Sequence, residues 1–157
     1  KIMEINFFGT ILLTKKVLPV MIEKGGGIMA VTSSFAGKFG FPLRSSYSAS
    51  KHALHGFFET LRLEYQKNNI RVTIACPGRI NTDISIKALS KGGVAHGVMD
   101  KGQEKGMDVT KCAQQYIRAI EKNRKEVFIG KKDLVVVYLR QYFPFLFYKI
   151  IGKISPT

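Results

Sequence analysis

Three short apolar segments, separated by much longer helical ones, constrain the fold of this chain most. Residues 28–34, 70–76 and 126–130 read as strands. A short continuous apolar run such as 28–31 is typical of a strand that is buried on both faces of a parallel sheet. The intervening segments are long enough for the helical crossovers that parallel strands require. The sequence therefore predicts an α/β fold with a buried parallel sheet.

The segments before the first strand and between the first two strands are predicted to be largely apolar helices. Residues 1–24 and 46–68 are each apolar around much of their circumference. We therefore expect burial on several sides, by the sheet and, for the first helix, by a partner chain. Pro19 is expected to bend this helix or to end a segment of it. The cluster 25–27, three consecutive glycines, is predicted to be a helix stop and turn.

The start of the second helix carries a tyrosine and a lysine at helical spacing. Tyr47 and Lys51 are four residues apart and therefore share a helix face. An ammonium beside a phenol favours the phenolate, which suits a general acid/base. Ser45 or Ser46 is expected to cap the helix. In a chain with 6 tyrosines, one such pair arises easily by chance, so the neighbouring residues must decide its meaning.

Those neighbours follow a fixed order around the pair. Ser34 ends the first strand, Pro77-Gly78 ends the second with Thr82 shortly beyond, and Asn6 lies in an apolar segment, Ile-Asn-Phe-Phe-Gly. Together with the Tyr-Ser-Ala-Ser-Lys stretch, this pattern resembles the short-chain dehydrogenase/reductase family. The resemblance covers the chain from residue 1 to about residue 130.

The resemblance implies a Rossmann-like, doubly wound parallel sheet. It also implies an oxidoreductase that interconverts a carbonyl and an alcohol by hydride transfer. Tyr47 would be the general acid/base, and Lys51 would favour its phenolate and hydrogen-bond the nicotinamide ribose. Ser34 would bind the substrate carbonyl oxygen, with Ser33 as the weaker candidate. Asn6 would hold a water that links Lys51 to solvent, although an ordinary satisfied core amide is the alternative.

The resemblance also implies NAD or NADP as the cofactor, with NADP favoured. The backbone of Ile80 and the hydroxyl of Thr82 would orient the carboxamide, although Thr82 could equally cap a helix. The full set of implied cofactor-binding residues is Tyr47, Lys51, Pro77, Gly78, Ile80 and Thr82.

Members of this family begin with a glycine-rich turn that seats the cofactor pyrophosphate, and this sequence shows no such turn. We therefore expect a fragment of a Rossmann-like domain whose N-terminal nucleotide-binding half is absent from the chain. On its own, such a fragment is expected to be inactive. The first strand would then expose an edge, which we expect another chain or segment to cover.

Three regions around the expected site carry further predictions. In the loop 35–44, Phe39, Phe41 and Leu43 either line a substrate pocket or tuck into the core. Residues 85–108, rich in Lys and Gly, occupy the place of the family's substrate lid, although surface disorder gives the same composition. A helix is expected over 108–123, with Thr110 as its cap.

Charge and the C-terminus bear on partners. The net charge of +14 favours anions such as a phosphorylated cofactor or a membrane surface, and without a nucleic-acid motif we expect no nucleic-acid partner.

We divide the chain into a catalytic part, 1–133, and an apolar, basic tail, 134–157. The composition of this tail is typical of a helix that lies on a membrane surface. The alternatives are a helix packed over the active-site mouth and a helix packed on another subunit. A weaker resemblance points to a dehydrogenase/reductase member 7-like branch, which includes membrane-associated members.

The cysteines and histidines give no metal-ligand spacing, so no metal site is expected. Cys76 and Cys112 indicate reduced thiols, as in a cytoplasmic protein. The tail would associate this protein with membranes. The expected substrate is a small carbonyl or alcohol compound, lipophilic if the tail recruits it. The family resemblance implies a homodimer or homotetramer. The competing hypotheses are a non-enzymatic scaffold or cofactor sensor, and a membrane-surface binding module.

Overall fold

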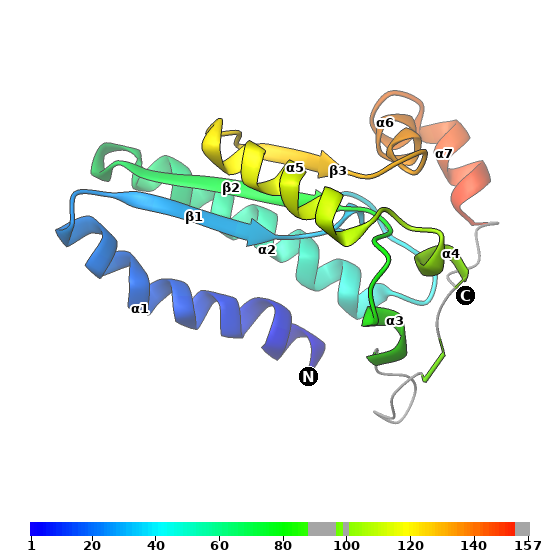
Figure 1. Cartoon of the computed structure of the whole chain (residues 1–157), viewed down its shortest axis with the longest axis horizontal. Coiled ribbons are helices and arrows are strands. Elements are labelled where there is room, and N and C mark those ends of the chain that lie inside the picture. Colours follow the sequence, from blue (N-terminus) through cyan, green and yellow to red (C-terminus); the bar gives the residue numbers. More distant parts are fainter. Residues whose placement is uncertain (88–96, 99–100, 153–157) are drawn as a thin grey trace.

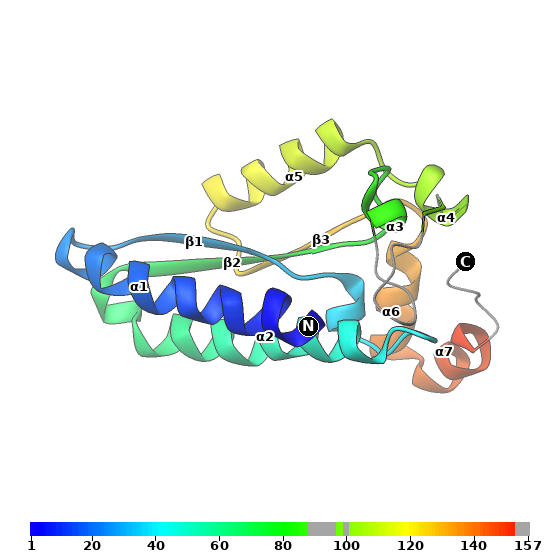
Figure 2. The same cartoon turned by 90° about the horizontal axis from the view of Figure 1, so that it is seen from below.

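The computed structural model describes residues 1–87, 97–98 and 101–152. Figure 1 shows a sheet with helices along it, and Figure 2 shows that these helices lie on both faces. The helices and strands, in chain order, are a π-helical turn Glu4–Phe8, α1 Gly9–Glu23, β1 Gly27–Thr32, a 3-10 turn Phe35–Gly37, α2 Ser45–Glu64, a 3-10 turn Gln66–Asn68, β2 Ile70–Pro77, α3 Ile84–Lys87, α4 Lys101–Glu104, α5 Val109–Glu121, β3 Glu126–Ile129, α6 Leu134–Tyr142 and α7 Pro144–Ile151.

The three strands form one parallel sheet in the order β1-β2-β3. Ile70 of β2 lies opposite Gly27 of β1, and Ile74 of β2 lies opposite Glu126 of β3. Helices α1 and α2 cover one face of the sheet and α5 covers the other (Figure 2). This is the Rossmann-like, doubly wound arrangement that the family resemblance implies. Within the described residues, the outer edge of β1 has no strand beside it.

The main hydrophobic core lies between α2 and the sheet. Leu54 and Phe58 of α2 are each 1% exposed, and they belong to one buried cluster with Ile74 of β2. Val137 of α6 and Phe147 of α7 belong to the same cluster, so the C-terminal helices also contribute to this core. A single apolar interior therefore holds both the sheet and the C-terminal helices in place.

Two of the predicted helix caps are wrong. Helix α2 begins at Ser45 without a side-chain cap, so neither Ser45 nor Ser46 serves as one. Helix α5 is capped by Asp108, whose carboxylate accepts the backbone N–H three residues on, at 3.0 Å. Thr110 already lies inside that helix. Asp108 is a better N-cap than Thr110 because its carboxylate is also favoured by the positive end of the helix dipole.

Proline and glycine shape the C-terminal half of α1. The helix continues through Pro19 to Glu23, so Pro19 does not end it. Pro19 is exposed, and water can therefore hydrate the carbonyl that loses its N–H partner. Gly25 and Gly26 then stop the helix with φ of 83° and 125°, as predicted. At Gly26 a Cβ would lie 2.6 Å from the Asn69 carbonyl oxygen, so only glycine fits there.

We predict that Phe58→Ala lowers the free energy of unfolding by about 3–5 kcal/mol, because it opens a cavity between α2 and the sheet. The change is measured by urea denaturation. Thr60→Ala is the control, because Thr60 is exposed on the same helix and hydrogen-bonds only the backbone of Gly56 within it. Equal midpoints for the two variants would contradict this account of the core.

Candidate active site

A cavity of about 610 Å³ opens beyond the carboxyl ends of the strands. Its volume lies in the usual range for small-molecule sites. The end of β1, the loop after β2, the start of α2 and the first turn of α6 all contribute to its wall. The sequence-predicted residues that line it are Ser33, Ser34, Phe39, Phe41, Tyr47, Lys51, Pro77, Gly78, Ile80 and Thr82.

Tyr47 and Lys51 lie side by side at the start of α2. The Lys51 Nζ is 5.7 Å from the centroid of the Tyr47 ring, as their four-residue spacing predicts. The same Nζ donates a hydrogen bond to the Thr32 carbonyl oxygen at 3.0 Å. Burial lowers the pKa of Lys51 and outweighs the opposing influence of Cys76. An ammonium has further N–H donors, so Lys51 can also bind a ligand in the cavity.

The two serines after β1 use their hydroxyls differently. Ser34 Oγ accepts the N–H of Ala36 at 3.2 Å and so begins the 3-10 turn. Within the described residues, its hydroxyl proton has no acceptor and can be donated to a ligand. Ser33 is 3% exposed, and its hydroxyl donates to the Lys51 carbonyl oxygen at 3.3 Å. Ser33 therefore braces α2, whereas Ser34 retains a donor for a ligand.

Asn6 reaches the site indirectly. It lies in the π-helical turn, and its Nδ2 donates to Ser50 Oγ at 3.1 Å. Ser50 in turn donates to the Tyr47 carbonyl oxygen at 2.7 Å. Asn6 and Lys51 also both line a groove of about 380 Å³ between α1 and β1. The π-turn was not predicted from the sequence, although such turns are frequent at functional sites.

The loop after β2 is held by backbone hydrogen bonds and by one carboxylate. The Gly78 N–H donates to the Ile129 carbonyl oxygen at 2.8 Å, and the Arg79 N–H donates to Asp133 Oδ2 at 3.0 Å. A Cβ at Gly78 would overlap the Asp133 carboxylate and lie 2.6 Å from the Phe35 ring. Sequence reasoning missed Asp133, because only the folded chain brings the turn before α6 to this loop.

Thr82 lies near the end of the same loop and lines the cavity. Its Oγ1 contacts the Ile80 carbonyl oxygen at 3.5 Å. Helix α3 begins two residues later, at Ile84. Because this contact is long, the Thr82 hydroxyl can exchange it for a ligand at little cost.

The described part of the expected lid packs on this loop. The Met107 N–H donates to the Arg79 carbonyl oxygen, and the Asn81 N–H donates to the Met107 carbonyl oxygen, each at 2.8 Å. Gln103 of α4 donates through its side chain to Ile80 and lines the cavity. Residues 88–96 and 99–100 of the expected lid, His96 included, lie outside the described residues.

The aromatic loop 35–44 divides between the two predicted roles. Phe39 is 4% exposed and belongs to the core while also lining the cavity, and half-buried Phe41 lines it as well. Leu43 is 86% exposed and does neither. Sequence reasoning did not anticipate Cys112 and Val136 as lining residues, because helices far along the chain supply them.

Comparison with known proteins gives a consistent result. The family model described as short chain dehydrogenase matches residues 1–93. "Dehydrogenase/reductase SDR family member 7B" of Mus musculus is 42% identical over 156 residues, which are 98% of this chain and 48% of that protein. "Dehydrogenase/reductase SDR family protein 7-like" of Drosophila melanogaster is 37% identical over 98% of this chain and 47% of its own. The chain thus spans about half the length of these relatives.

Solved structures show the same fold. A short chain dehydrogenase from Burkholderia cenocepacia J2315 in complex with NADP has a TM-score of 0.78 at 23% identity, over 98% of this chain and 58% of its own. A short chain dehydrogenase/reductase from Burkholderia phymatum in complex with NAD has a TM-score of 0.73 at 21% identity, over 99% of this chain and 59% of its own. By the matched family model and the shared fold, the chain belongs to the short-chain dehydrogenase family.

Proposed function

We propose that the protein containing this chain is an NAD(P)-dependent oxidoreductase that interconverts a carbonyl and an alcohol, with Tyr47 as general acid/base. The observation that carries the proposal is the convergence of Ser34, Tyr47 and Lys51 on one cavity at the carboxyl ends of the strands. In open α/β sheets, ligands bind at this edge. A scaffold or cofactor sensor that keeps the fold without turnover is the alternative.

The residues around the cavity fit the nicotinamide end of the cofactor. Pro77, Gly78, Ile80 and Thr82 form one wall, and Lys51 provides N–H donors for a ribose. When bound, the nicotinamide supplies or accepts the hydride. The net charge of +14 supports NADP, the more anionic of the two cofactors, and the structural relatives include one in complex with NADP and one in complex with NAD.

The chain's own residues would handle the proton and the substrate oxygen. In the reducing direction, Tyr47 donates its phenolic proton to the carbonyl oxygen, while the free hydroxyl proton of Ser34 orients that oxygen. Lys51 favours the resulting phenolate. Asn6 holds a water that links Lys51 to solvent, and the groove that both residues line supports this relay. The proton then returns to Tyr47 from solvent.

The cavity wall supports a lipophilic substrate. Phe35, Phe39, Phe41 and Val136 provide apolar contacts around the polar Tyr47. Apolar walls with few polar groups are typical of sites that bind largely apolar compounds. We therefore propose a small carbonyl or alcohol compound with an apolar body as the substrate class.

Exposed apolar surface on α1 supports a homodimer or homotetramer. Leu12 and Leu13 are 64% and 65% exposed, and Phe8 is 52% exposed. On β1, Ile28 is 39% exposed beside the open edge. Exposed apolar patches of this kind mark interaction surfaces. We propose that another chain or another segment of the protein covers them. The helix Glu4–Glu23 is also long and apolar enough to cross a membrane, by length and composition.

The C-terminal helices support contact of residues 134–157 with a membrane surface. Instead of one helix, the structure has two, α6 and α7, which separate at Phe143. On α7, Phe145 is 84% and Tyr148 61% exposed, whereas Phe147 is 1% exposed and anchors the helix. The Arg140 guanidinium lies 5.4 Å from the Tyr148 ring centroid. Exposed aromatic rings beside cations are typical of membrane-surface helices.

We predict that Tyr47→Phe in the full-length protein lowers turnover by about 10²–10⁴-fold, the usual contribution of a general acid/base. Cofactor affinity should remain nearly unchanged, because the ring and its packing persist. Turnover is followed by nicotinamide absorbance and affinity by fluorescence titration. Tyr65→Phe, at the far end of the same helix, is the control and should retain full turnover. Near-normal turnover in Tyr47→Phe would contradict the assignment.

We also predict that the double variant Phe145→Ser/Tyr148→Ser loses binding to vesicles that contain phosphatidylserine. Wild-type protein should co-sediment with these vesicles, less so as salt rises, because salt screens its basic residues. Point substitutions are preferable to deletion of 134–157, since α6 and α7 contribute Val137 and Phe147 to the core. Vesicle binding that is equal in both proteins would show that this surface is not used.

A further inference from the structure

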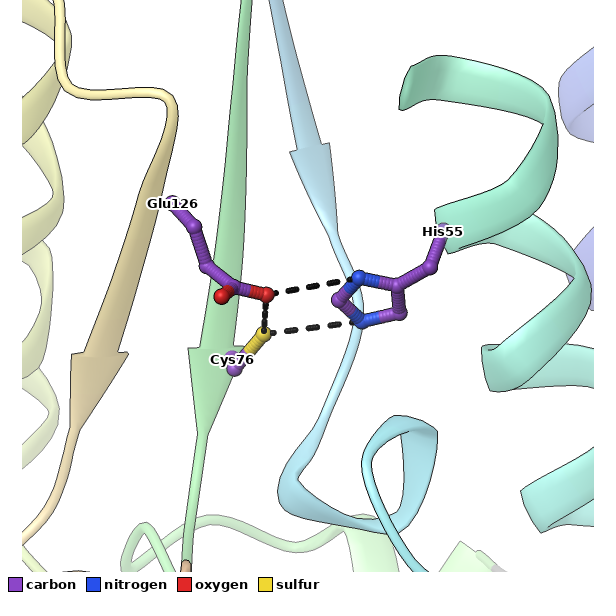
Figure 3. A group of neighbouring side chains, drawn as sticks. All are labelled: His55, Cys76 and Glu126. Atoms are coloured by element: carbon purple, nitrogen blue, oxygen red, sulfur yellow. Dashed lines mark hydrogen bonds and ion pairs between the residues drawn. The ribbon is translucent and has the colours of Figure 1, made fainter. Parts of the chain in front are cut away.

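A cluster of three potential metal ligands lies between α2 and the sheet, and none of the three lines the cavity described above. His55 comes from α2, Cys76 from β2 and Glu126 from β3, and Figure 3 shows their side chains pointing toward one another. Cys76 Sγ is 3.7 Å from His55 Nε2 and 3.6 Å from Glu126 Oε1. Glu126 Oε1 is 3.4 Å from His55 Nδ1. All potential ligand atoms lie within 4.8 Å of one another.

The separation of Cys76 and Glu126 is close to that of two ligands of a tetrahedral metal ion, whereas the two distances to His55 run to different ring nitrogens, so the imidazole must turn to place one nitrogen near both. Zinc binds sulfur at about 2.3 Å and nitrogen or oxygen at about 2.0–2.2 Å, so the ligand atoms around it lie about 3.3–3.6 Å apart. A thiolate, an imidazole and a carboxylate also match the donor types that zinc selects. We propose that Cys76, Glu126 and one ring nitrogen of His55 bind a zinc ion.

The polar atoms at the centre of the cluster are incompletely satisfied. His55 is 7% exposed, and within the described residues its buried Nδ1 makes long contacts with carboxylates but no hydrogen bond of good geometry. Two carboxylates face this atom, Glu126 at 3.4 Å and Glu59 at 3.6 Å. A buried polar atom without a partner is costly, and a bound cation would satisfy it. Glu59 is half exposed and contacts only the His55 side of this group, so water would complete the coordination of an ion.

The cluster is closed on one side and open on the other. Cys76 is fully buried, whereas the side chains of Glu126 and Glu59 are 29% and 51% exposed. An ion can therefore enter from solvent past the two carboxylates and reach the sulfur last.

Lys38 is the internal competitor for this ion. Its Nζ lies 2.9 Å from Glu126 Oε1 and neutralises that carboxylate in the metal-free protein. Zinc binding must displace the Lys38 ammonium and release the thiol proton of Cys76 to solvent, since the thiolate is the ligand. The bound ion would then tie α2 to β2 and β3, one helical turn beyond Lys51.

The test is titration of the full-length protein with Co²⁺, followed by displacement with Zn²⁺. We expect a thiolate-to-cobalt charge-transfer band and intense visible absorption of a tetrahedral site. Cys76→Ser should abolish the charge-transfer band, and His55→Gln should lower zinc affinity by at least about 100-fold. Lys38→Met should raise the affinity several-fold. The control is Cys112→Ser, because Cys112 is half-buried and packs against the separate hydrophobic cluster that contains Ala75.

Lys38→Met keeps the test decisive if a ligand variant fails to fold, because it leaves all the ligands in place. The proposal is overturned if wild-type protein shows no charge-transfer band with Co²⁺. It is equally overturned if the band survives Cys76→Ser or disappears in Cys112→Ser. An unchanged zinc affinity in both His55→Gln and Lys38→Met would also overturn it.

Discussion

The packing of α2 on β2 fixes the geometry on which the rest of the site depends. Leu54 and Phe58 are nearly inaccessible against the sheet, so the helix cannot rotate without opening the core. Tyr47 and Lys51 stand on the same helix, at the end that overhangs the carboxyl edge of the strands. A locked helix therefore presents these two side chains to the cavity in a defined orientation.

Sequence reasoning succeeded where the physics is local. Apolar runs located the strands, four-residue spacing placed Lys51 beside Tyr47, and Gly25-Gly26 marked the end of α1. It failed where two distant segments decide the outcome. The Asn6 contact with Ser50 joins residues 44 positions apart. The hydrogen bond from the Arg79 N–H to Asp133 joins the loop after β2 to a residue 54 positions further along the chain.

Successive side chains of β2 alternate between two separate hydrophobic clusters, one on each face of the sheet. Cys76 points toward α2 and belongs to the main core, whereas Ala75 belongs to the smaller cluster beneath α5. Immediately after Cys76, Pro77 and Gly78 form part of the cavity wall. The polar group of His55, Cys76 and Glu126 thus sits behind the wall of the cavity. Ser33, hydrogen-bonded to Lys51, marks the boundary between them.

The glycines at 78 and 130 carry a consequence for sequence change in this fold. A Cβ at Gly130 would lie 2.8 Å from the Asp133 carboxylate and 3.0 Å from Phe35, and one at Gly78 would overlap the same two side chains. Neither glycine can gain a side chain unless Asp133 or Phe35 moves. Chains that replace one of these four residues must adjust the others, so the four positions should drift through evolution as a linked set.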